Sequence, residues 1–252
     1  DYLGDIIAYS KANGMHARVI TNGQLLADEG RMKTLVDQGL DHIHLSVQTS
    51  DAALQARLTG NEDSLPNLLK TLDNAGKLGL NVDINTTINH YNAGQLHHLV
   101  QFLVGRYPFL HHFVWNNLDP SMNRATENPD VVHHLWEFEV SLFLAMKFLR
   151  ATGRTFRAEK VPLCYMADFA ECSTETRKIV KGEERIVRFL DEKGMVRETL
   201  FQHGKGDACL YCRFDSICAG LYDMDEHYHS DELAPVFLDP DVVRARVMAE
   251  PD

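Results

Sequence analysis

The chain has 252 residues, 44% of them hydrophobic, which is enough to bury a substantial core. Its formal net charge of -11 argues against binding to a nucleic-acid phosphate backbone as the main activity. No stretch approaches the roughly twenty uninterrupted apolar residues of a membrane helix, and no signal peptide opens the chain. We therefore expect a cytoplasmic protein that binds neither nucleic acid nor a membrane.

Helical and strand-like segments alternate from the start of the chain. A helix is expected up to Gly14, because apolar residues recur at helical spacing and a glycine follows them. Strands are then expected at 17–21, 43–47, 81–88, 112–115 and 154–161. The intervening helices are expected at 31–38, 64–78, 93–105 and 131–149, while the segment from the second strand to Gly60 is interpreted as a loop.

This alternation predicts the fold class. Strands and helices that alternate at this spacing imply parallel strands joined by right-handed crossovers. The expected fold is α/β, either a barrel or an open doubly wound sheet. In both, ligands bind at the carboxyl ends of the strands. The residues expected there are small and polar: Thr21-Asn22-Gly23, Ser46 to Thr49, Asn85 to Asn92 and Asn116-Asn117. They suit a polar zwitterionic ligand, although the same residue types form ordinary turns.

Three cysteines near the C-terminus carry the strongest chemical signal. Cys209, Cys212 and Cys218 form C-x-x-C-x-x-x-x-x-C, a spacing typical of metal ligands, and Cys164 supplies a fourth thiolate from upstream. Four thiolates favour an iron-sulfur cluster, because zinc ribbons usually repeat two C-x-x-C pairs. Zinc and plain buried thiols stay as alternatives. Cys172 lies outside the triplet and is either structural or an alternative fourth ligand.

A hairpin is expected between Cys164 and the triplet. Its two alternating runs are 185–190 and 195–200, and Asp191 to Gly194 has the composition of a turn with glycine at a left-handed position. Chain reversal at this turn makes a four-cysteine site feasible. A cluster with four protein ligands leaves no open iron for substrate, which favours electron transfer or a structural role. Residues 225–232 resemble a metal-binding string but are expected to be a solvated loop.

Several of these motifs resemble those of the radical S-adenosylmethionine (SAM) enzymes. The resemblance lies in Thr21-Asn-Gly, in 39–48, in Arg57-Leu-Thr-Gly60 and in 80–89. The triplet, which ends in Cys218-Ala-Gly-Leu-Tyr222, resembles the C-terminal auxiliary-cluster extension of that superfamily, of the SPASM or twitch type. The resemblance implies a partial (β/α)6 TIM-like barrel that lacks its first strands at 1–161, followed by the extension and tail at 162–252.

The resemblance also implies a reaction and its partners. In this superfamily SAM meets a 4Fe-4S cluster and is split reductively to a 5′-deoxyadenosyl radical, which abstracts hydrogen from the substrate. The implied substrate is a peptide or a small metabolite, and the implied reductant is a flavodoxin or ferredoxin-type protein. The implied ligands of an auxiliary 4Fe-4S cluster are Cys164, Cys209, Cys212 and Cys218.

Four residues match positions that contact SAM in the superfamily. They are Thr21, Ser46, Arg57 and Asn85. Each also has a local explanation, as a turn cap, a solvated helix residue or a partner of neighbouring backbone.

The chain departs from the superfamily in the motifs that hold the SAM-binding cluster. Neither the C-x-x-x-C-x-x-C loop nor a Gly-Gly-Glu-Pro element occurs in it. Because Asp1 enters at a helix that would follow the second of these elements, we expect upstream sequence that carries both.

Two other classes of function fit parts of the sequence. A zinc-stabilised α/β binding or regulatory protein without SAM chemistry would account for the cysteines. A different barrel enzyme, such as an aldolase or a hydrolase, would need a base or a Schiff-base lysine at a strand end, and Lys160 is the near candidate.

Overall fold

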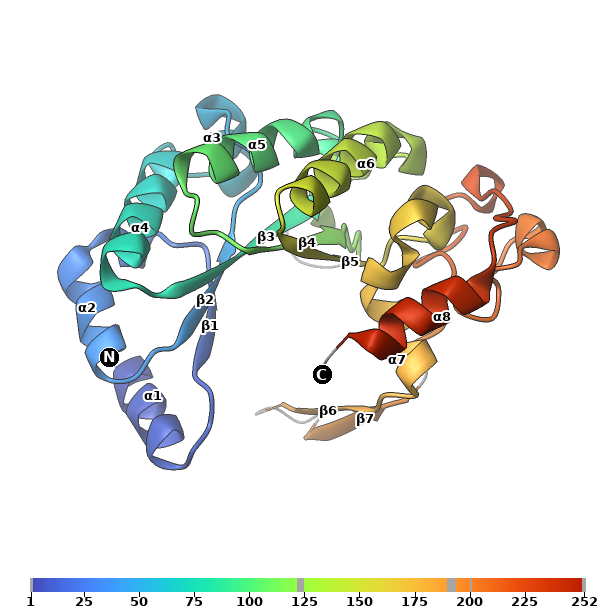
Figure 1. Cartoon of the computed structure of the whole chain (residues 1–252). Helices are drawn as coiled ribbons and strands as arrows, with labels where there is room; N and C mark the ends of the chain where they lie inside the picture. The colour runs from blue at the N-terminus through green and yellow to red at the C-terminus, as the bar shows by residue number, and fades with distance from the viewer. Residues whose placement is uncertain (1, 122–124, 190–193, 200, 251–252) are drawn as a thin grey trace. The chain divides into compact units, whose positions relative to one another are not determined.

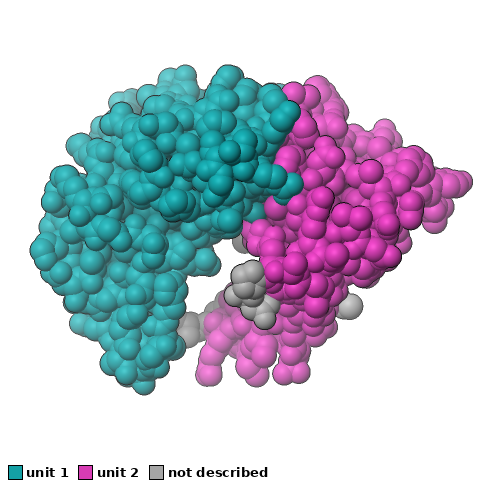
Figure 2. Space-filling view, viewed as in Figure 1, with its two compact units in different colours: residues 1–115, 144–156 teal, residues 116–143, 157–252 magenta. Residues whose placement is uncertain are grey.

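The structure is a computed structural model that describes residues 2–121, 125–189, 194–199 and 201–250 (Figure 1). Contacts divide the chain into two compact units, which Figure 2 colours separately. The first unit comprises residues 1–115 and 144–156, and the second comprises residues 116–143 and 157–252. The domain boundary between 161 and 162 stays a prediction.

A five-stranded sheet has the order β1-β2-β3-β4-β5. β1 pairs in parallel with β2, and β2 pairs in parallel with β3. Parallel neighbours need crossover connections, which helices provide here. The α/β prediction is confirmed, and all five strands lie close to their predicted positions: β1 (Arg18–Thr21), β2 (His42–Ser46), β3 (Asn81–Ile88), β4 (His112–Asn117) and β5 (Thr155–Glu159).

Helices precede and connect these strands (Figure 1). They are α1 (Leu3–Ala12), α2 (Glu29–Asp37), α3 (Ala52–Thr59), α4 (Ser64–Leu78), α5 (Leu96–Arg106) and α6 (Leu135–Ala151). The α6 helix begins in the second unit and ends in the first, since the division falls between residues 143 and 144. Of the helices in the described residues, none combines the length and apolar character that crossing a membrane requires.

The loop expected before Gly60 contains a helix, so that part of the prediction is wrong. The backbone N–H of Leu54 donates to the Asp51 side chain at the start of α3, and Gly60 ends the helix at a φ of 68°. The side chain that α3 buries is Gln55, which is 1% exposed. A helix that buries an amide instead of an apolar stripe has no hydrophobic periodicity to predict it.

The neighbouring strands β2 and β3 have one apolar face and one polar face. Ile43 pairs in register with Val82, and Leu45 with Ile84, and all four side chains are buried. Leu72 of α4 is also fully buried, which fits a core between the sheet and its helices. The alternate positions of β2 and β3 are half-buried and polar: His42, His44, Ser46, Asp83 and Asn85.

The second unit contains the segment expected to be a hairpin. β6 (Arg185–Arg188) and β7 (Met195–Glu198) form an antiparallel pair, and Gly194 has the expected left-handed φ, at 58°. The predicted turn residues 191–193 lie outside the described residues. Two helices flank this pair in sequence, α7 (Thr174–Lys181) and α8 (Pro240–Ala249). Neither helix is among those expected from the sequence.

Candidate functional site

Four of the five cysteines line one cavity in the second unit. The cavity encloses about 20 Å3, or about 310 Å3 when the open solvent beside it is included. Its wall also contains Pro162, Leu163, Leu233, Ala234, Gly220, Lys205 and Asp215. The four are the predicted set of Cys164, Cys209, Cys212 and Cys218. Cys172 is 6% exposed and does not belong to this wall. Metal ligation by the four thiols stays a prediction.

Local packing holds the triplet in place. Cys209 and Cys212 lie at a short 3-10 turn, in which the N–H of Cys212 donates to the carbonyl of Cys209 at 3.1 Å. Beyond this turn, Phe214 and Ile217 are 1% and 0% exposed. The Thr176 hydroxyl of α7 donates to the Ile217 carbonyl at 2.9 Å. These buried anchors fix the loop that leads to the third cysteine.

Cys164 reaches the cavity from the segment that follows β5. It lies in the 3-10 turn Leu163–Tyr165. The Tyr165 hydroxyl donates to the Glu232 carbonyl at 2.7 Å, and the Tyr165 ring contacts Phe138 with centroids 5.7 Å apart. Tyr165 therefore fixes the turn that presents Cys164 to the other three thiols.

Backbone N–H groups point at two of the sulfur atoms. The N–H of Val236 donates to Cys212 Sγ at 3.3 Å, and the N–H of Gly220 donates to Cys218 Sγ at 3.3 Å. Gly220 has a φ of 100°, and a Cβ there would lie 2.3 Å from the Gly204 carbonyl oxygen. Donors aimed at sulfur favour the thiolate form and tune iron-sulfur clusters. The backbone around the cavity is thus arranged for charged sulfur.

The thiols influence one another electrostatically. Burial raises the pKa of Cys164 to about 12, and the nearby Cys218 and Cys209 contribute to this rise. Burial also raises the pKa of Cys218, while the charge of Lys205 acts in the opposite direction. Ionising these buried thiols costs free energy. A metal ion that displaces the protons would offset that cost, so the ionised form of the site would depend on the bound ion.

Sequence reasoning missed Lys205. Its Nζ donates to the Cys218 carbonyl at 2.8 Å and to the Asp215 carboxylate at 2.9 Å. The available signal was weak: a lysine between two glycines, four residues before Cys209. Spacing along the chain gives no sign that its side chain reaches the third cysteine.

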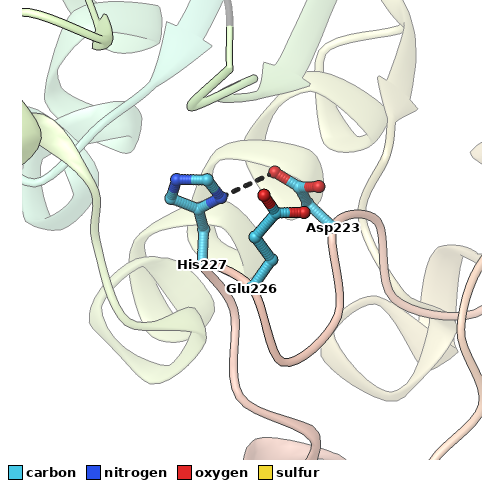
Figure 3. Close-up of side chains that lie close together, drawn as sticks. All are labelled: Asp223, Glu226 and His227. Carbon is cyan, nitrogen blue, oxygen red and sulfur yellow. Dashed lines mark hydrogen bonds and ion pairs between the residues drawn. The ribbon is translucent and has the colours of Figure 1, made fainter.

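A second group of ligating side chains lies at residues 223–227 (Figure 3). The ligand atoms of Asp223, Glu226 and His227 lie within 4.8 Å of one another, and His227 Nδ1 is 2.8 Å from Asp223 Oδ2. Glu226 is exposed, and Asp223 also accepts from the Ser121 hydroxyl at 3.3 Å. Because two members already bind each other and the third faces solvent, we assign no metal to this group.

Two of the four candidate SAM contacts lie together in the first unit. Ser46 and Asn85 are register partners at the carboxyl-end half of β2 and β3, and both are half-buried on the polar face. Thr21 pairs with Leu45, so the register places it on the apolar face. The N–H of Gly23 donates to the Thr21 hydroxyl at 3.0 Å, which is the local capping role considered for it.

Arg57 has a local partner of its own. It is exposed on α3, and its guanidinium donates to the Tyr91 hydroxyl at 2.6 Å. The guanidinium carbon also lies 4.0 Å from the centroid of the Tyr91 ring. The structure therefore pairs Ser46 with Asn85. Thr21 and Arg57 have local contacts instead, with Gly23 and Tyr91 respectively.

Other polar residues at the strand ends build the loops themselves. The Gln55 side-chain oxygen accepts from the N–H groups of Gln48 and Thr49, at 3.2 and 3.1 Å. The Asn92 amide donates to the carbonyls of Gln48 and Thr87, at 3.0 and 2.9 Å. Since these side chains satisfy buried backbone groups, turn formation explains them better than ligand contact does.

Comparisons with known proteins show similarity in the first part of the chain. Residues 1–103 match the family model of the radical SAM superfamily. The chain is 30% identical over 102 residues to the PqqA peptide cyclase of Methylocella silvestris, across 40% of this chain and 27% of that protein. It is 32% identical over 91 residues to the PqqA peptide cyclase of Xanthomonas euvesicatoria pv. vesicatoria, across 36% of this chain and 24% of that protein. The matched segment thus spans about a quarter of the length of these relatives.

Solved structures share the fold over nearly the whole chain. The structure of native anSMEcpe with bound AdoMet gives a TM-score of 0.53 at 12% identity, and covers 93% of this chain and 71% of that one. The structure of anSMEcpe with AdoMet and the Kp18Cys peptide gives 0.54 at 13% identity, with 93% and 72% covered. The resemblance to the radical SAM superfamily is thereby confirmed for residues 1–103, and the solved structures show a shared fold over nearly the whole chain.

Proposed function

We propose that this chain is part of a radical SAM enzyme that modifies a peptide, and that its second unit holds an auxiliary 4Fe-4S cluster. The observation that carries the proposal is that four cysteines line one cavity. The same chain matches the radical SAM superfamily in its first 103 residues. The proposed cluster ligands are Cys164, Cys209, Cys212 and Cys218.

The donor set supports a cluster over a single zinc ion. A 4Fe-4S cluster is held by four thiolates, whereas zinc ribbons usually repeat two C-x-x-C pairs and this chain has one such pair.

The first unit supplies residues for the cofactor. When bound, SAM and its own 4Fe-4S cluster supply a radical that takes hydrogen from the substrate. Ser46 and Asn85 offer a hydroxyl and an amide side by side, Ser46 at the end of β2 and Asn85 in the carboxyl-end half of β3. Barrel enzymes bind ligands at the carboxyl ends of their strands. We propose that these two contact SAM directly. Thr21 and Arg57 stay candidates for indirect roles through the loops that they hold.

The names of the relatives support a peptide as the substrate class. Two are PqqA peptide cyclases, and one structural neighbour was solved with the Kp18Cys peptide. A flavodoxin or ferredoxin-type protein is the proposed reductant. The five free cysteines fit a reducing compartment such as the cytoplasm.

Anaerobic iron and sulfide analysis of the purified chain tests the proposed cluster. We expect a brown protein with broad thiolate-to-iron absorption and close to four irons and four sulfides per cluster. Substitution of any one of the cavity cysteines, such as Cys209→Ser or Cys164→Ser, should lower the iron content and the melting temperature, because cluster binding contributes folding free energy.

Cys172→Ser is the matched control, since Cys172 lies outside the cavity wall. It should leave the iron content near that of the wild type. One equivalent of zinc without sulfide in the wild type would instead establish the zinc-stabilised alternative. Equal iron loss in Cys172→Ser and Cys164→Ser would show that the fourth ligand is wrongly assigned.

A further inference from the structure

Lys205 is the one lysine or arginine in the described wall of the cysteine cavity. Its Nζ donates to the Asp215 carbonyl at 3.0 Å, to Asp215 Oδ1 at 2.9 Å and to the Cys218 carbonyl at 2.8 Å. An ammonium group has three N–H donors, so these contacts use all of them. All three acceptors belong to the loop that carries the triplet. The position of the charge is therefore fixed with respect to the sulfur atoms.

The backbone immediately before Lys205 is fixed as well. Gly204 donates to the Leu221 carbonyl at 3.1 Å and accepts from the Leu221 N–H at 2.8 Å. Leu221 is fully buried and lies three residues after Cys218. The side chain of Lys205 is 30% exposed, whereas the Asp215 side chain is 56% exposed. Solvent thus screens the carboxylate more than the ammonium.

The cavity needs a positive charge when its thiols are ionised. Four thiolates bring four negative charges beside apolar side chains such as Leu163 and Leu233. The Lys205 ammonium lies in the wall of the same cavity, where hydrogen bonds hold it in place, and it supplies a charge of the opposite sign. The same charge would favour every further electron placed on a centre in this cavity.

We propose that Lys205 sets the reduction potential of the iron-sulfur centre held by the four cysteines, with Asp215 as its partial counter-charge. This inference rests on the proposed auxiliary cluster. One-electron reduction adds a negative charge to the centre and moves no proton. The fixed ammonium stabilises the reduced state and raises the potential, because net charge and nearby dipoles tune such clusters. The exposed carboxylate opposes this effect.

Redox titrations of the anaerobically reconstituted 252-residue chain, followed by electron paramagnetic resonance, test the proposal. Lys205→Met keeps the aliphatic stem and removes the charge, so the midpoint potential should become more negative. Asp215→Asn removes the counter-charge and should make the potential more positive. Lys205→Arg keeps the charge and should stay near the wild type. Lys178→Met is the control, because Lys178 contacts the Phe201 ring and does not belong to the cavity wall.

The shifts in midpoint potential expected for Lys205→Met and Asp215→Asn have opposite signs. This difference separates electrostatic tuning from a structural role of the two side chains. Shifts of Lys205→Met and Asp215→Asn in the same direction, or no shift in either at full iron content, would overturn the inference and leave the proposed cluster intact. A wild-type chain that binds zinc and no sulfide would overturn both. If Lys205→Met fails to load iron, the exposed Asp215→Asn variant decides the question, since a positive shift is required of it.

Discussion

Asp119 ties three segments of the second unit together. Its Oδ2 atom accepts from Lys160 Nζ at 2.8 Å and from the Tyr222 hydroxyl at 2.6 Å, while Oδ1 accepts from the Ser121 N–H at 3.2 Å. Lys160 Nζ also lies 3.8 Å from the centroid of the Tyr222 ring. Lys160 is therefore committed to an ion pair and a ring contact, which argues against the Schiff-base lysine that an aldolase would need.

Replacing Asp119 by asparagine should destabilise the protein in a manner that depends on pH. Burial opposes ionisation of Asp119, but hydrogen bonds from Lys160 and Tyr222 outweigh it and hold its pKa below the usual value. A lowered folded-state pKa gives stability that is present above the unfolded pKa of about 3.9 and is lost as the pH falls through the folded value. We expect Asp119→Asn to cost about 1 to 3 kcal/mol at pH 7, and less below pH 4.

Urea unfolding at several pH values checks this expectation. Asp37→Asn is the control, because Asp37 forms an exposed pair with Lys33, which is worth roughly 0.5 kcal/mol or less. A difference between wild type and Asp119→Asn that stays constant from pH 7 to pH 3 would contradict the assignment of the effect to ionised Asp119.

At the scale of elements, apolar periodicity decided what could be predicted. The bounds of α4 and β3 agree with the prediction, because α4 buries Leu68, Leu72 and Ala75 at helical spacing and β3 alternates strictly. The left-handed Gly79 at the end of α4 adds a second signal. Where buried apolar residues followed the period of the element, the sequence was enough.

The helices that the sequence did not predict bury polar side chains or bury only a few side chains. α3 buries Gln55, and α7 buries Glu175 and Thr176. α8 buries only Val243 and Val247 among its residues. Their capping residues were visible in the sequence, since Asp51, Ser173 and Asp239 all accept from backbone N–H groups. The Gln55 side chain contacts the backbone of Gln48 and Thr49 just before the helix and the Ser64 hydroxyl after it, and hydrophobic periodicity gives no sign of such polar contacts.

Gly220→Ala should disrupt the segment that follows the triplet. Its φ of 100° is unfavourable for a residue with a side chain, and the added Cβ would lie 2.3 Å from the Gly204 carbonyl oxygen. We expect a loss of roughly 2 to 4 kcal/mol of stability together with lower iron content. Gly105→Ala is the matched control, because nothing lies within 4 Å of a Cβ there and alanine favours the helix by about 0.5 to 1 kcal/mol.

Thermal unfolding and iron analysis of the two variants give the comparison. If Gly220→Ala melts at the wild-type temperature and keeps its iron, the close approach of Gly204 and Gly220 is not needed by the site.

At the scale of the whole molecule, the two candidate sites belong to different units. The cysteines lie in the second unit, and the Ser46–Asn85 pair lies in the first. Spacing along the chain pointed to Cys209, Cys212 and Cys218, because thiols cluster for few reasons other than metal, whereas the choice of Cys164 over Cys172 needed the cavity wall. The choice of Ser46 and Asn85 over Thr21 needed the strand register, which a single sequence does not state. A shift of one residue in the pairing of a strand would exchange its polar and apolar faces.

SAM binding by a longer protein that also carries a C-x-x-x-C-x-x-C motif tests the strand-end pair. Asn85→Ala should weaken binding by about 1 to 3 kcal/mol, because a buried hydrogen bond to the ligand is lost. Asn81→Ala is the control, since Asn81 lies on the same face of β3 at its amino end and is exposed. Calorimetric titration should show wild-type affinity for the control. Equal weakening by both would remove Asn85 from the site.

The chain crosses between the two units more than once, so neither unit can be removed as one continuous segment. The backbone passes from one unit to the other near residues 115, 143 and 156, within β4, within α6 and within β5. A graft of the cysteine-bearing extension onto another scaffold would therefore need more than one junction, and Tyr228 shows why. This side chain is 1% exposed, contacts the His133 ring with centroids 5.4 Å apart and donates its hydroxyl to the Leu118 carbonyl at 2.9 Å. An extension cut out at a single point would lack Leu118 and His133, which Tyr228 contacts in its core. The graft therefore has to include the segment between β4 and α6.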